Sequence, residues 1–89
     1  MDLAQLRAAQ ASGAAVLDVR EPHETAGGAL PGSLLIPLAE VLADPDRVAA
    51  DRVVVVCARG FRAQRAAVAL RERGVDAVVL VGGLSEWQR

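Results

Sequence analysis

The sequence predicts an α/β domain: a mainly parallel sheet of about four to five strands flanked by helices in three layers. Its strand-like runs are apolar at consecutive positions and lack the alternation expected of a half-exposed strand. Segments with helical spacing of apolar residues separate these runs. A chain of 89 residues supports one core, so we expect a single domain over residues 1–89.

The first elements are a short helix and a buried strand. Residues 2–11 fit a helix that Asp2 caps and that packs on a sheet face; Ser12 and Gly13 then close it. Residues 14–19 form the first clear strand, which ends before Pro22 because proline cannot continue the ladder.

A loop and an interrupted helix follow the first strand. Residues 21–32 are rich in turn formers and are predicted to be a loop. Residues 33–36 form a short strand, and a helix begins over residues 38–42. Residues 44–46 contain Asp-Pro-Asp and interrupt this helix before a second helical turn over residues 47–50.

The valine run at 53–56 is predicted to be a central strand, because it is apolar on both faces. Cys57 stands at its carboxyl end, and a helix follows as far as Arg73, with Gly74 as its stop. Residues 77–81 form another buried strand. The buried side of the helix after the cysteine is predicted to contain Ala63, Ala66, Ala67 and Leu70.

Composition excludes several classes of function. The formal net charge of −1 does not favour binding to nucleic acid or to an acidic membrane surface. All 10 basic residues are arginine, which excludes a lysine Schiff base. The 1 cysteine and 1 histidine exclude an internal disulfide and a structural zinc site, and we expect no cofactor or metal. Without a signal peptide or a transmembrane run, we expect a cytoplasmic protein with no membrane contact.

Cys57 is the candidate nucleophile. Strand and helix prediction places it just before a helix N-terminus, where the dipole, nearby arginines and backbone amides favour a thiolate. The segment from Cys57 to Arg62 can curl its amides into an anion-binding nest, since Gly60 permits positive φ. Arg59 and Arg62 add guanidinium groups that suit oxyanions of sulfur or phosphorus.

Two reactions fit such a loop: phosphate-ester hydrolysis through a cysteinyl phosphate, and transfer of a sulfane sulfur through a cysteine persulfide. Phosphatases of the cysteine type share a Cys-x5-Arg loop. Here Cys57 and Arg62 give Cys-x4-Arg, and Ala63 follows. The shorter loop forms a tighter cradle, which suits a single sulfur atom better than a phosphoryl group.

Several separated motifs resemble those of single-domain rhodaneses, the sulfurtransferase family. They span about residues 16–87 in the family's order. The motifs are Leu17-Asp18-Val19-Arg20-Glu21 with Glu24, Gly28-Ala29-Leu30-Pro31-Gly32-Ser33 leading to Ile36-Pro37, Cys57-x-x-Gly60-x-Arg62, and Val81-Gly82-Gly83 with Trp87. Ala29 and Ala63 depart from the family, which commonly has histidine and serine there.

The resemblance implies that Cys57 accepts sulfur from a small anionic donor such as thiosulfate and passes it to cyanide or a thiol, including a thiol on a protein. The loop amides would stabilise the persulfide, Arg62 would brace the loop, and Arg59 would attract the donor. Asp18 and Arg20 would lie beside the site, with Arg20 in a bracing role. The substrate-binding residues implied are Ala58, Arg59, Gly60, Phe61, Arg62, Asp18 and Arg20.

Alternatives remain at this stage. The enzymatic alternative is a cysteine-dependent phosphatase or arsenate reductase on the same fold, and the other is a non-catalytic rhodanese-like domain that binds an anion or a partner. Asp18 and Arg20 could form a purely structural ion pair. His23 is interpreted as a surface or loop-packing residue, and Phe61 as lining either the pocket mouth or the core beneath the loop.

Overall fold

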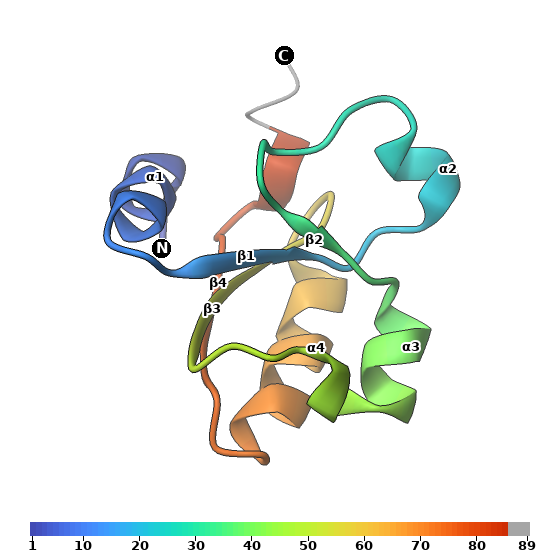
Figure 1. Ribbon diagram of the computed structural model, residues 1–89. Helices are drawn as coiled ribbons and strands as arrows, with labels where there is room; N and C mark the ends of the chain where they lie inside the picture. The colour runs from blue at the N-terminus through green and yellow to red at the C-terminus, as the bar shows by residue number, and fades with distance from the viewer. Residues whose placement is uncertain (86–89) are drawn as a thin grey trace.

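A computed structural model describes residues 1–85, which form a parallel four-stranded sheet with helices on both faces (Figure 1). The strand order is β2-β1-β3-β4, and every neighbouring pair is parallel. This architecture confirms the predicted α/β fold class. The strands are β1 (Ala15–Asp18), β2 (Leu34–Leu35), β3 (Arg52–Val56) and β4 (Asp76–Val79).

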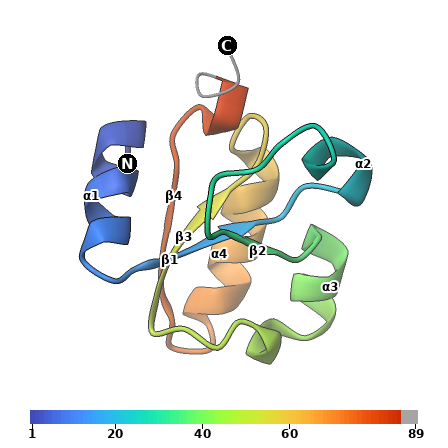
Figure 2. The ribbon, with the colours of Figure 1, turned by 45° about the horizontal axis from the view of Figure 1, so that its top comes forward.

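The helices form the two outer layers. On one face of the sheet, α1 and η2 contribute Leu6 and Leu84 to one apolar cluster, and α3 and α4 cover the other face (Figure 2). The helices are α1 (Leu3–Ala11), α2 (Pro22–Thr25), α3 (Leu38–Ala43) and α4 (Phe61–Arg71), with 3-10 turns η1 (Pro45–Arg47) and η2 (Gly83–Ser85).

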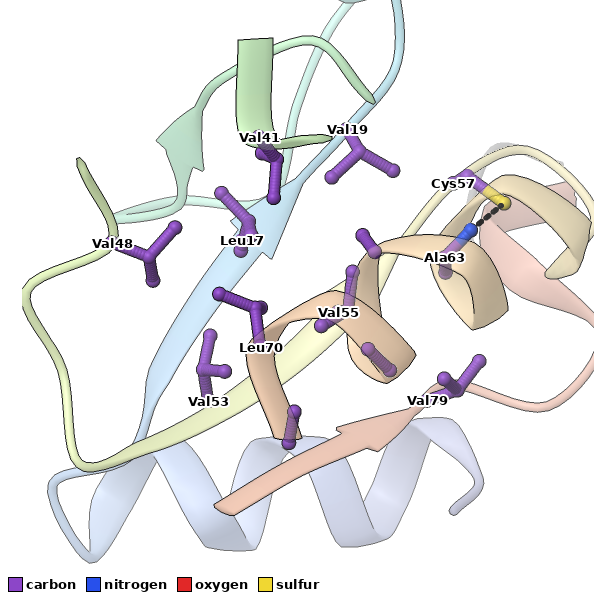
Figure 3. Packing of buried hydrophobic residues seen from close by; sticks show 13 residues of the cluster. Leu17, Val19, Val41, Val48, Val53, Val55, Cys57, Ala63, Leu70 and Val79 are labelled. Atoms are coloured by element: carbon purple, nitrogen blue, oxygen red, sulfur yellow. Dashed lines mark hydrogen bonds between the residues drawn. The ribbon is translucent and has the colours of Figure 1, made fainter. Parts of the chain in front are cut away.

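Strand β3 is central and buried on both faces, as its valine run predicts. Val53 and Val55 belong to the cluster on the α4 side, where they pack near Leu70 (Figure 3). Val54 and Val56 belong to the cluster on the α1 side. Because both faces of β3 are covered, the strand holds the Cys57 that follows it on a rigid support.

Other local predictions are confirmed. Asp2 caps α1 and forms a capping box with Gln5, and Ser12 ends that helix. The buried residues of α4 are the alanines and leucine predicted from helical spacing. Within residues 1–85, no helix has both the length and the apolar character needed to cross a membrane.

Three local predictions are wrong. The predicted buried strand over residues 77–81 corresponds to β4, which ends at Val79, and Val81 beyond it is 75% exposed. Residues 22–25 form the short helix α2 inside the predicted loop, because Pro22 suits a first helical position and Glu24 forms a capping box with Glu21. The predicted turn over residues 47–50 instead begins at Pro45, whose fixed φ starts the 3-10 turn η1. Trp87, part of the last motif, lies outside the described residues.

Candidate active site

The candidate site lies at the carboxyl edge of the parallel sheet. Asp18 of β1 is in register with Val56 of β3, so the ends of these strands bring Asp18 and Cys57 to the same rim. The loop from β3 to α4, the turn η2 and the helix α2 all lie at this edge (Figure 2). Ligands bind at this edge in open α/β sheets.

The Cys57 sulfur lies inside a cradle of backbone amides. Gly60 donates its N–H to Sγ at 2.9 Å. Ala63 donates its N–H to the same sulfur at 3.4 Å, and Figure 3 shows this second bond. Gly60 has φ 104°, in the left-handed region, which confirms the expectation that Gly60 permits the positive φ of a curled loop. The two amides therefore point at the sulfur from the loop and the first turn of α4.

A cavity of about 190 Å³ opens onto this cradle. Its lining consists of the loop residues Cys57, Ala58, Arg59, Phe61 and Arg62. Cys57 itself is 1% exposed, so the cavity is the route to its sulfur. Phe61 is 79% exposed, which places its ring at the pocket mouth and not in the core.

Arg62 is held by a carboxylate from α2. Its Nη1 and Nη2 donate to Oε1 and Oε2 of Glu24 at 2.5 and 2.9 Å. The side-chain hydrogen bond from Arg62, together with the backbone N–H of Glu21, lowers the pKa of Glu24 from 4.5 to about 2. The same hydrogen bond raises the pKa of Arg62. The ion pair therefore joins α2 to the first turn of α4.

Asp18 and Arg20 form a buried pair beside the loop. Arg20 Nη2 lies 2.8 Å from Asp18 Oδ2, and Arg20 Nε also donates to the same carboxylate. Arg20 Nη2 additionally donates to the carbonyl of Gly28 at 2.9 Å. The two side chains bond to each other, and Arg20 also bonds to the loop after α2. They lie at the rim, and the described residues show no hydrogen bond from either side chain to the cysteine loop.

The chain around η2 forms the floor of the loop. Leu84 N–H donates to the Cys57 carbonyl at 2.9 Å, and Ser85 N–H donates to the Ala58 carbonyl at 3.2 Å. A Cβ on Gly83 would lie 2.4 Å from the Ala58 carbonyl oxygen. Only glycine at position 83 lets the two backbones approach this closely.

Sequence reasoning did not assign roles to Glu24 and Gly83. Both residues belong to the motifs quoted above, and membership of a motif was the one sign in the sequence that they matter. The residues they contact lie far away in the chain. His23 is exposed, which agrees with its interpretation as a surface or loop-packing residue.

Comparison with known proteins agrees with this geometry. The rhodanese-like domain family matches residues 2–89. The chain belongs to the rhodanese-like family. This finding confirms the resemblance seen in the motifs.

Two relatives each match most of the chain. Protein YqhL of Bacillus subtilis (strain 168) is 36% identical over 76 residues, which cover 83% of this chain and 60% of that protein. The chain therefore spans about three fifths of that relative's length. A protein of Allochromatium vinosum named sulfurtransferase is 33% identical over 76 residues, covering 83% of this chain and 71% of that one.

A solved structure matches over almost the whole chain. The human single-domain sulfurtransferase TSTD1 superposes with a TM-score of 0.83 at 30% identity, covering 99% of this chain and 93% of that one. The fold that presents Cys57 is thus shared with a protein named for sulfur transfer.

Proposed function

We propose that this rhodanese-like domain moves a sulfane sulfur from a donor such as thiosulfate to cyanide or a thiol, through a persulfide on Cys57. The observation that carries the proposal is the pair of amides, from Gly60 and Ala63, that donate to Sγ inside the short cradle. The sulfurtransferase names of two relatives support it.

In the first half-reaction the Cys57 thiolate attacks the outer sulfur of thiosulfate. A bond forms between Sγ and that sulfur, the S–S bond of thiosulfate breaks, and its electron pair leaves with sulfite. The product, a Cys57 persulfide anion, carries its charge on the terminal sulfur. The loop amides over residues 58–62 and the N-terminus of α4 would stabilise this charge.

In the second half-reaction cyanide or a thiolate attacks the terminal sulfur. The bond from that sulfur to Sγ breaks, its electron pair returns to Cys57, and thiocyanate or a new persulfide departs. The charges balance in both steps, and no cofactor or metal enters either.

The other site residues receive positioning roles. Arg59 is exposed at the cavity, where its charge would attract the anionic donor. Arg62, fixed by Glu24, would hold the first turn of α4 against the loop. Asp18 and Arg20 would brace the rim through their buried pair. Phe61 would line the entrance to the sulfur.

We further propose that residues 1–89 act as one domain in the cytoplasm. A reducing compartment keeps the lone cysteine as the thiol that the first half-reaction needs.

The test is thiocyanate formation from thiosulfate and cyanide, with hydrolysis of 4-nitrophenyl phosphate measured in parallel. The proposal predicts thiocyanate with the wild type and none with Cys57→Ser, which preserves the size and shape of the side chain. Hydrolysis of the phosphate ester that is lost in Cys57→Ser, with no thiocyanate from the folded wild type, would instead support the phosphatase alternative. If the folded wild type shows neither activity, the result would support the non-catalytic alternative.

A further inference from the structure

A second and larger cavity lies next to the one at Cys57. It measures about 390 Å³ and runs along β4 and along one side of α4, from Phe61 to Arg71. Arg59 and Phe61 line both cavities, so the two meet at these side chains. We call the larger one the β4 groove. Its volume suits the organic part of a small molecule.

The β4 groove has an unusual concentration of exposed apolar surface. Phe61 is 79% exposed and Val81 is 75% exposed, the two highest values among the described large apolar side chains. Val78 of β4 adds half-buried apolar surface to the same wall. Single exposed apolar residues are ordinary, but these line one groove that adjoins the Cys57 cavity, where a ligand would cover them.

The charge of the β4 groove is positive. Arg59 and Arg71 line it, and its described lining contains no carboxylate side chain. Arg71 Nε donates to the Ala77 carbonyl, which fixes the side chain against β4 and leaves its two terminal nitrogens available. Within residues 1–85 neither arginine makes an ion pair. A guanidinium on an apolar wall recognises a carboxylate on an apolar chain.

We propose that the β4 groove binds the organic part of the sulfur acceptor, and that the preferred acceptor is a thiol on an aliphatic chain that ends in a carboxylate. This inference rests on the proposed sulfur transfer. The aliphatic chain of the acceptor lies along Phe61 and Val81, and its carboxylate binds Arg71. Its thiolate attacks the terminal sulfur of the Cys57 persulfide. The new S–S bond forms on the acceptor, and the electron pair of the broken bond returns to Cys57.

The first test compares acceptors of different length with cyanide. The probes are mercaptoacetate, 3-mercaptopropionate, 6-mercaptohexanoate and 6-mercaptohexanol, with thiosulfate as donor. Each methylene that reaches the groove is expected to raise kcat/KM about two- to fourfold, from the free energy of burying a CH₂ group. The carboxylate should be preferred over the alcohol of equal length about three- to tenfold, and added salt should reduce that preference.

Variants locate the effect in the β4 groove. In Val81→Ser, the ratio of kcat/KM for 6-mercaptohexanoate to that for cyanide is expected to fall about threefold or more. Val68→Ser is the matched control, because Val68 is also exposed but lies on α4 outside the groove. Arg71→Gln should remove the preference for the carboxylate over the alcohol, and Arg71→Lys should restore part of it.

A binding measurement separates this inference from the proposed function. Hexanoate, which has no thiol, is expected to shift the methyl NMR signals of Val78 and Val81 but not those of Val68. Absence of these shifts, or equal kcat/KM for short and long mercaptocarboxylates while cyanide reacts, overturns the groove assignment alone. If no thiocyanate forms at all, the proposed function is wrong, and the assignment of an acceptor to the β4 groove is wrong as well.

Discussion

Glu24 and Arg62 form a two-point ion pair across 38 positions of sequence, and this pair ties α2 to the helix that begins at the cysteine loop. Glu24 belongs to a segment whose other end, at Gly28, receives a hydrogen bond from Arg20. The segment from Glu24 to Gly28 is therefore held at both ends by arginine side chains. Its rigidity positions the first turn of α4, and hence the amide of Ala63 that faces Cys57.

Glu24→Gln should weaken this connection. The pair is partly exposed, with side-chain exposures of 35% for Arg62 and 24% for Glu24, so the expected loss of folding free energy at neutral pH is about 1 kcal/mol. Urea unfolding of wild type and variant measures this loss. The rate of persulfide formation should also fall, because Arg62 loses its fixed orientation, and Glu72→Gln on the exposed end of α4 is the matched control.

The stability difference between wild type and Glu24→Gln should depend on pH. The folded pKa of Glu24, about 2, lies below the ordinary 4.5, so the pair stabilises the fold fully above pH 4.5. This contribution decreases as the pH falls from 4.5 towards 2, where the folded carboxylate also takes up its proton. Urea midpoints measured across this range should converge on acidification. A difference that stays constant or grows would contradict the assigned role of the ion pair.

Gly83→Ala should disrupt the floor of the cysteine loop. Both Gly82 and Gly83 have positive φ, so alanine at either position costs about 1 kcal/mol of backbone strain. Only at position 83 would the new Cβ also overlap the Ala58 carbonyl, because no atom lies within 4 Å of a Cβ on Gly82. Gly83→Ala should therefore lose clearly more stability and more sulfur transfer than Gly82→Ala, by calorimetry and thiocyanate formation. Equal losses would mean that the contact with Ala58 is unimportant.

Arg20→Met should be strongly destabilising. It leaves the Asp18 carboxylate, which is 0% exposed, without its main partner, and removal of one member of a buried pair costs about 3–5 kcal/mol. The double variant Asp18→Leu, Arg20→Met removes both charges and should regain part of this loss in urea unfolding. If the single variant is as stable as the wild type, the pair does not brace the rim.

Much of the fold could be predicted because its signals are local. The valine run of β3, the cap of α1 and the alanine side of α4 each depend on residues close together in the chain. Gly60 could also be interpreted locally, since the tight turn before a helix requires positive φ. The short helix α2 was missed because its proline and turn formers equally suit a loop.

The contacts that complete the candidate site are not local. Nothing near Arg62 in the sequence indicates that its partner is Glu24, and nothing near Gly83 indicates a contact with Ala58. Glu24 and Gly83 belong to the motifs, but the motifs do not indicate which residues they contact. Asp18 and Arg20 could be placed at the rim from strand polarity, but their burial as a pair required the packing of the loop after α2.

The most direct test of the central claim is the mass of the protein after incubation with thiosulfate, measured without reductant and followed by peptide mapping. The account predicts an added mass of one sulfur atom, located on the peptide that contains Cys57, absent in Cys57→Ser and removed by cyanide with release of thiocyanate. A folded wild-type protein that gains no sulfur, or gains it equally in Cys57→Ser, would contradict the account.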